Sequence, residues 1–298
     1  MAARINAGHE AEVETWRAQR YAALRRPLGW LTLAGLAWLR EGDNSLGADP
    51  AGEIVLPSGP TRAGRLHVAG GTVTAHDDSG GGLSHEGRAV QDLPMIADVD
   101  GPDGRGPTVL ELGPLRLCVI RRGDRLGVRT WDTEAAALQT FDGIDHWPVD
   151  PAWRLAARLE PAAESSMIDV PDVLGDVAQQ PTPGTVAFEV DGVTHRLEAL
   201  HGGDAGELWL VFGDATNGNE TYDGGRFVYT VPPDADGRVI LDLNRAHNPP
   251  CVFSPYATCP LPWAANRLPV RIEAGERRYG DRAHEPRRRP GPSGDGGE

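Results

Sequence analysis

The chain of 298 residues contains no lysine, because all 29 of its basic residues are arginine. This absence excludes a lysine Schiff base, a phosphate-loop lysine and a catalytic lysine. The chain also lacks a run of about 18 apolar residues, which a membrane-spanning helix would need. Its first 20 residues are charged and have no apolar core of the kind found in secretory signals. The sequence therefore predicts no membrane partner.

Basic charge and cysteine are also scarce. The 43 acidic residues give a formal net charge of -14, whereas a nucleic-acid-binding surface needs a basic footprint, so we predict no nucleic-acid partner. An odd number of cysteines, Cys118, Cys251 and Cys259, without a signal sequence is typical of a reducing compartment. We therefore predict a cytoplasmic protein. Hydrophobic residues make up 40% of the chain, enough to form a core.

The beginning of the chain predicts a helix and then a buried apolar segment. Val13, Trp16, Tyr21 and Leu24 fall on one face of a helix over residues 9–26, which Pro27 ends. Residues 28–39 are apolar and bend at Ala34-Gly35. This pattern favours a buried hairpin, with a short buried helix as the alternative.

Short strands separated by turn residues dominate the rest of the chain. A first series is predicted at residues 53–56, 65–68, 72–75, 88–90, 108–112, 115–121 and 126–131. A second series is predicted at residues 153–159, 185–190, 193–200, 207–212, 226–231, 239–243 and 268–274. Asp191-Gly192 is a strong signal for a type I′ hairpin turn. Because strands do not alternate with helices, the pattern disfavours a parallel α/β fold.

We therefore predict a mainly β fold in which an N-terminal helix precedes two β-sandwich or barrel-like domains. The predicted boundaries are residues 1–27 for the helix, 28–145 for the first domain and 146–276 for the second. Residues 277–298 are rich in arginine, glycine and proline and are predicted to be a disordered tail.

An unusual density of polar residues marks the segment of residues 212–276. Polar groups between apolar strands are costly unless they pair with each other or bind a ligand. This cost makes the segment the first place to look for a functional site.

The same segment resembles the bacterial and archaeal domain of unknown function 1684, and the resemblance extends over roughly residues 16–276. The matching motifs lie at residues 212–222, 225–227, 242–251, 258–268 and 274–276. Leu243 stands where the family has an aromatic residue, His247 where it has tyrosine and Trp263 where it has proline. The resemblance implies no established activity, and a mechanism that depends on His247 would not be general for such relatives.

A second resemblance concerns the first domain. Residues 39–47 followed by residues 53–56 are similar to the opening of a forkhead-associated β-sandwich. That fold binds phosphothreonine through an arginine that follows a Leu-Gly pair, and Ala48 stands at this position here. The resemblance thus implies the fold. It does not imply phosphopeptide recognition, because the arginine that this function needs is absent.

Asp214, Glu220 and Arg226 are candidates for chemistry in the polar segment. The two carboxylates could act as an acid/base pair or bind a hard metal ion. For Asp214 we favour an Asx turn, and for Glu220 an ion pair with Arg226 is the equal alternative. Arg226 follows two glycines and could clamp a carboxylate or phosphate, with a buried structural ion pair as the alternative.

His247 and Cys251 are four residues apart, but Pro249-Pro250 forbids a helix that would align them. A nucleophilic pair and a zinc site with Cys259 and Asp214 are possible arrangements. Simple packing of a proline-rich loop is favoured over both, and a cis peptide bond at Asn248-Pro249 or Pro249-Pro250 is one way to hold that loop.

These observations predict a small-molecule pocket in the second domain, with an anionic ligand. The candidate catalytic residues are Glu220, His247 and Cys251, and the candidate ligand-binding residues are Tyr222, Arg226, Asn244, Asn248 and Asn266. We predict no metal and no cofactor. Three function classes remain open: a hydrolase-type enzyme, a non-catalytic binding module, and an interaction adaptor that uses the forkhead-like domain.

Overall fold

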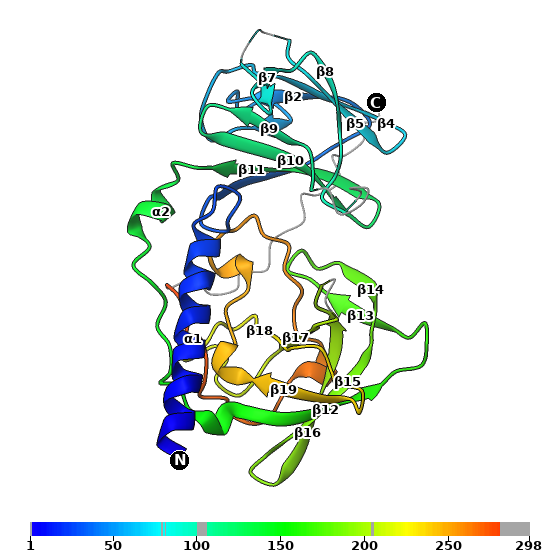
Figure 1. The fold of residues 1–298 in the computed structure, drawn as a ribbon. Helices are drawn as coiled ribbons and strands as arrows, with labels where there is room; N and C mark the ends of the chain where they lie inside the picture. Colours follow the sequence, from blue (N-terminus) through cyan, green and yellow to red (C-terminus); the bar gives the residue numbers. More distant parts are fainter. Residues whose placement is uncertain (1, 79, 81, 100–105, 204–205, 281–298) are drawn as a thin grey trace. The chain divides into compact units, whose positions relative to one another are not determined.

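The computed structural model describes residues 2–78, 80, 82–99, 106–203 and 206–280 (Figure 1). These residues form two compact units. Unit 1 contains residues 2–21, 142–253 and 258–280, and unit 2 contains residues 22–141 and 254–257. Residues 2–21 thus share a unit with the second strand series, whereas the sequence had set residues 1–27 apart. Most of the predicted tail, residues 281–298, lies outside the described residues.

Helix α1 (Ala2–Leu24) begins well before residue 9 and ends two residues before the predicted end. The chain turns directly after it, where the Gly29 N–H donates to the Arg26 carbonyl at 2.7 Å, since Pro27 cannot continue a helix. Val13 and Leu24, on the predicted apolar face, are buried, and so is His9.

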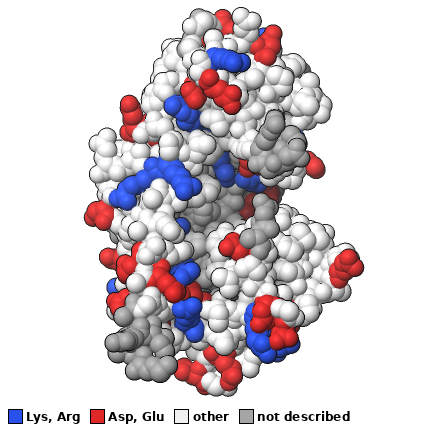
Figure 2. Space-filling view, in the orientation of Figure 1, with Lys and Arg blue, Asp and Glu red and all other residues white. Residues whose placement is uncertain are grey.

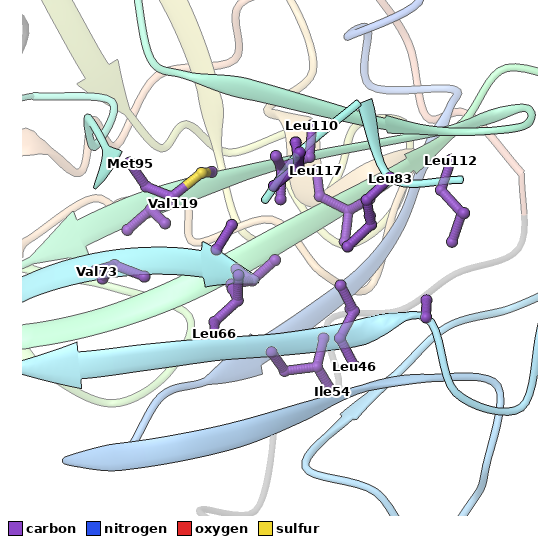
Figure 3. Close-up of a cluster of buried hydrophobic side chains, with 14 of the residues drawn as sticks. Leu46, Ile54, Leu66, Val73, Leu83, Met95, Leu110, Leu112, Leu117 and Val119 are labelled. Atoms are coloured by element: carbon purple, nitrogen blue, oxygen red, sulfur yellow. The ribbon is translucent and has the colours of Figure 1, made fainter. Parts of the chain in front are cut away.

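Unit 2 is a β-sandwich whose two sheets share one apolar core. One sheet has the order β1-β11-β10-β9-β6-β7, and the other has the order β3-β2-β4-β5-β8. The first consists of β1 (Leu33–Trp38), β11 (Arg125–Asp132), β10 (Leu115–Arg122), β9 (Val109–Leu112), β6 (Ser84–His85) and β7 (Arg88–Ala89). The second consists of β3 (Ile54–Val55), β2 (Gly42–Gly47), β4 (Gly64–Ala69), β5 (Thr72–His76) and β8 (Asp92–Met95). Leu66 and Val73 from the second sheet join Leu117 and Val119 from the first in the core (Figure 3).

The hairpin predicted over residues 28–39 does not form. Only β1 is a strand, and it pairs with β11 far along the chain. The bend predicted at Ala34-Gly35 is a register irregularity between Leu33 and Gly35 inside this one strand. Long-range pairing therefore replaces the local turn that the glycine indicated.

Unit 1 is built on a six-stranded antiparallel sheet with the order β18-β17-β16-β15-β12-β19. Its strands are β18 (Arg226–Tyr229), β17 (Leu208–Phe212), β16 (Val193–His201), β15 (Gly184–Val190), β12 (Arg154–Pro161) and β19 (Arg238–Asp242). Beyond β19, His247 and Phe227 of the edge strand β18 exchange backbone hydrogen bonds of 2.8 and 2.9 Å, which form an isolated antiparallel bridge. The hairpin between β15 and β16 turns at Asp191 and Gly192, whose φ angles are 51° and 75°, as the sequence predicted.

Irregular segments pack against this sheet and cover its apolar core, to which they contribute Leu243, Ala246, Leu268, Ile272 and Ala274. The short 3-10 helices η3 (Leu243–Arg245), η4 (Pro250–Val252) and η5 (Ala264–Asn266) lie in them, and η2 (Pro151–Trp153) precedes β12. Residues 268–274, predicted as a strand, belong to this irregular cover. Among the described peptide bonds none is cis, so the cis-proline prediction was wrong.

The hairpin of β13 (Met167–Pro171) and β14 (Val177–Pro181) was not predicted. All five residues of β14 are exposed, so its sequence carries no alternation of apolar and polar residues.

The prediction of a mainly β protein with an N-terminal helix and two β-rich parts is confirmed. No helix within the described ranges is long and apolar enough to cross a membrane. Acidic and basic side chains are interspersed on the face shown in Figure 2. Several surface arginines pair with carboxylates, as Arg196 does with Glu160 at 3.0 Å and Arg40 with Glu53 at 2.7 Å.

Candidate functional site

Arg226 lies at the start of β18 with its side chain fully buried. Its guanidinium donates to Asp214 Oδ2 at 2.5 Å, to the Ile272 carbonyl at 2.9 Å and to the Ala274 carbonyl. Burial lowers the pKa of Arg226, and the charge of Asp214 opposes that effect. The sequence had offered Glu220 as the ion-pair partner of Arg226, and this was wrong. The buried partner is Asp214, so the arginine is neutralised inside the fold.

The loop that follows β17 holds Asp214 in place. Asp214 Oδ1 accepts from the backbone N–H and the hydroxyl of Thr216, at 2.8 and 2.6 Å. The amide oxygen of Asn217 accepts from the Asp214 N–H at 2.6 Å, and the amide nitrogen of Asn217 donates to the Thr221 hydroxyl at 2.8 Å. The preferred interpretation of Asp214 as an Asx-turn residue is therefore confirmed.

Glu220 lies at the rim of the same loop, where its side chain is 31% exposed. It accepts a hydrogen bond of 2.7 Å from Arg271. This hydrogen bond holds the pKa of the Glu220 carboxyl below its usual value, which leaves the group ionised and poorly suited to donate a proton near neutral pH.

His247 is buried in an aromatic cluster that consists of Trp16, Trp209, Phe227, Tyr229 and His247 itself. Its ring stacks on Tyr229 at 5.9 Å between centroids and lies 5.8 Å from Trp16. Burial first, and then the charge of Arg20, lower the pKa of His247 to about 3. The ring is therefore neutral near pH 7. Because its Nδ1 lies 3.1 Å from the Arg245 carbonyl, the proton is assigned to Nδ1.

Glu276, which is fully buried, forms a second ion pair with the half-buried Arg20, and the sequence did not single it out as a site. Arg20 donates to both carboxylate oxygens of Glu276, and the Asn248 N–H donates to Glu276 Oε2 at 2.7 Å. Burial raises the pKa of Glu276, but the charge and hydrogen bonds of Arg20, together with His247 and the Asn248 N–H, outweigh it, so the pKa is lowered. The motif Ala274-Gly-Glu276 was the signal that could have identified this carboxylate.

Three asparagines predicted as ligand-binding residues bond to backbone. Asn266 accepts from the Glu198 N–H at 2.8 Å and donates to the Glu198 and Val211 carbonyls, each at 2.9 Å. Asn244 exchanges two 2.9 Å hydrogen bonds with the backbone of Asp150. The amide nitrogen of Asn248 donates to the carbonyl of Arg277 at 2.8 Å. Asn266 thus fastens the irregular cover to β16 and β17, whereas Asn244 and Asn248 bond to segments outside the sheet.

Cys251 and Tyr222 lie together with Cys259. The backbone N–H of Cys251 donates to Cys259 Sγ at 3.1 Å, and the Tyr222 hydroxyl makes a side-chain hydrogen bond with Cys251. The possible zinc ligands Asp214 and His247 do not join this group, because Asp214 is bound to Arg226 and His247 lies in the aromatic cluster. Among the described residues, no group of three or more His, Cys, Asp and Glu side chains is placed to hold a metal ion. Glu220, His247 and Cys251 thus have three different sets of neighbours.

An open groove of about 420 Å³ lies beside α1, and sequence reasoning missed it. It is lined by Gly8, Ala11, Glu12, Thr15, Trp16, Gln19 and Arg245. Arg245 comes from η3, where its guanidinium is 3.5 Å from Asp242 and 3.8 Å from Glu12. Asp242 in turn accepts from His9 at 2.8 Å. The helical spacing of Ala11, Thr15 and Gln19 is the only sequence signal for this groove.

A comparison with protein families finds a match over the part of the chain that contains the polar segment. A family described as "Protein of unknown function (DUF1684)" matches residues 139–277. A comparison with curated proteins finds no match. The chain is similar to the solution NMR structure of an uncharacterized protein of Haloarcula marismortui, with 31% sequence identity, coverage of 47% of this chain and 78% of that chain, and a TM-score of 0.39. Residues 139–277 of the chain therefore belong to the DUF1684 family of proteins of unknown function.

Proposed function

We propose that unit 1 is a non-catalytic binding module for a small organic anion that carries a flat ring, and that the ligand occupies the groove beside α1. The observation that carries this proposal is the presence of the Trp16 ring and the Arg245 guanidinium on one groove of about 420 Å³. Small-molecule sites commonly have volumes of about 300–1,000 Å³ and combine apolar rings with a few polar groups.

The two side chains supply complementary interactions. Trp16 is held against His247 and is only half-buried, so a face of the indole can stack on a ligand ring. Arg245 is 31% exposed, and its ion pairs at 3.5 and 3.8 Å are longer than charge-assisted hydrogen bonds. A carboxylate or phosphate on the ligand would give this guanidinium a closer partner, while Glu12 would accept from a ligand hydroxyl or amine.

The groups that were expected to react are either enclosed or already bound to a partner, and this favours ligand binding over catalysis. His247 is neutral and enclosed, and Glu220 is held ionised by Arg271. Arg226, the expected anion clamp, already has Asp214 and two carbonyls as partners. The hydrolase alternative and the cytoplasmic location stay predictions.

A thermal-shift titration with aromatic carboxylates and nucleoside monophosphates tests the proposal, with the corresponding uncharged ring compounds in parallel. A ligand at ten times its Kd adds about 1.4 kcal/mol, which corresponds to a rise in Tm of about 3–6 °C. We expect this rise with anionic ring compounds and a smaller one with the uncharged analogues. A flat response to every anionic ring compound would refute the proposal.

Two matched tryptophan variants locate the site. Ala11→Trp fills the groove, whereas Ala22→Trp places the same side chain on another exposed position of α1, about 16 Å further along the helix axis. Binding should be lost in Ala11→Trp and kept in Ala22→Trp. Equal binding by both variants would place the ligand elsewhere.

A further inference from the structure

Cys251 and Cys259 are neighbours in space although seven residues separate them in the chain. The Cys251 N–H donates to Cys259 Sγ at 3.1 Å. With an N–Cα bond of about 1.46 Å, the sulfur is therefore no more than about 4.6 Å from the Cys251 Cα. A disulfide needs the two Cα atoms to lie about 4.4–6.8 Å apart, and the contact between Cys259 Sγ and the backbone of Cys251 marks the place where such a bridge would form.

The two thiols differ in accessibility and are set apart from the third cysteine. Cys259 is 3% exposed, whereas Cys251 is partly exposed. Tyr222 lies against Cys251, and its pKa is raised by burial and then by the charge of Cys251, so its hydroxyl stays protonated and can donate to a thiolate. Cys118 is buried in unit 2, and burial raises the pKa of its thiol to about 12, which makes it unreactive.

We propose that Cys251 and Cys259 are a redox-active dithiol that a low-molecular-weight disulfide oxidises to an intramolecular disulfide. The Cys251 thiolate attacks one sulfur of the reagent, which breaks its S–S bond, releases one thiolate and forms a mixed disulfide. The Cys259 thiolate then attacks Cys251 Sγ and releases the second reagent thiolate. The two protein thiols lose two electrons, and the reagent is reduced to two thiols that take up the two protons.

The position of this pair gives the bridge a structural consequence. The chain leaves unit 1 after Phe253, contributes residues 254–257 to unit 2 and returns to unit 1 at Thr258. Ser254 is buried in unit 2, where its hydroxyl donates to the Leu33 carbonyl at 2.8 Å. The proposed disulfide would thus close the loop at the two points where it leaves and re-enters unit 1.

Oxidation by glutathione disulfide followed by peptide mapping tests the proposal. Trypsin cleaves after Arg245 and Arg267, so one peptide, residues 246–267, contains both cysteines. We expect this peptide to lose the mass of two hydrogen atoms, without a glutathione adduct. The oxidised protein should melt about 5–10 °C above the reduced protein, since the bridge closes a short loop in the unfolded chain.

Single cysteine variants in a Cys118→Ser background separate the attack of Cys251 on the reagent from the attack of Cys259 on the mixed disulfide. Cys259→Ser should keep one glutathione on Cys251, because no second thiol can resolve the mixed disulfide. Cys251→Ser should stay unmodified, because Cys259 is buried. A lasting adduct on the protein with both thiols, no reaction at all, or a disulfide-linked dimer would each overturn the proposal.

Discussion

Replacing His247 should remove a defined part of the acid sensitivity of this protein. The imidazole has a pKa of about 3 in the fold and of about 6.5 in an unfolded chain. Because the unfolded state binds the proton more tightly, the neutral ring contributes its full stabilisation above about pH 6.5 and loses it as the pH falls toward 3. Integrating between these two values gives a loss of about 2 kcal/mol between pH 8 and pH 5.

The charged groups near His247 support this direction. Arg20 lies close and also lowers the pKa, whereas Glu276 raises it but is itself bound to Arg20. Arg20 helps to hold the pKa of the Glu276 carboxyl below its usual value, and this ion pair is kept in the natural sequence and in the His247 variants alike. The difference between the protein and a variant therefore isolates the imidazole.

Urea unfolding at pH 8 and at pH 5 measures this effect on the natural sequence, His247→Tyr and His247→Gln. The tyrosine restores the residue that the family has here, and glutamine supplies a neutral polar control. Both variants should lose about 2 kcal/mol less than the natural sequence between the two pH values. Equal losses in all three proteins would show that the buried imidazole is not held neutral by the fold.

Two further substitutions, Gly225→Ala and Asn266→Ala, test the cover of the sheet, with Gly192→Ala as a control for the first. Gly225 has a φ of 86°, and a Cβ there would lie 2.4 Å from Pro262 Cγ and 2.6 Å from the Phe212 carbonyl oxygen, so Gly225→Ala should cost more than about 2 kcal/mol in urea unfolding. Gly192→Ala, with a similar φ of 75° but open space around it, should cost only about 1 kcal/mol, and equal costs would contradict the close contact. Asn266→Ala removes three hydrogen bonds and should cost about 3 kcal/mol; a cost below about 1 kcal/mol would mean that this side chain is free to meet a ligand.

Local sequence patterns were enough to predict strands in which apolar and polar residues alternate and whose partner strand follows after a short turn. Asp191-Gly192 is an example, because its turn needs only the positive φ angles of two adjacent residues. Residues 28–39 were misjudged because β1 pairs with β11, about 90 residues away, and no local signal encodes such a partner. The exposed strand β14 has no buried face, so it leaves no period in the sequence.

The polar residues of the candidate site were identified correctly as unusual, but their partners were not predictable. Arg226 bonds to the carbonyl of Ala274, 48 positions away, and Glu276 bonds to Arg20, 256 positions away. A sequence shows that buried polar groups need partners but does not show whether a ligand or the backbone supplies them. The groove beside α1 was missed because it depends on Arg245 meeting a helix more than 220 residues earlier.

A double-mutant cycle on Asp214 and Arg226 tests most directly whether the polar segment is held by its own partners. Asp214→Asn and Arg226→Met each leave one buried charge without its counterion, so each should cost about 3–5 kcal/mol. The double variant leaves neither charge, and its cost should be at least about 2 kcal/mol below the sum of the two single costs. Additive costs, or an Arg226→Met protein that keeps its stability but loses its anionic ligand, would contradict the account.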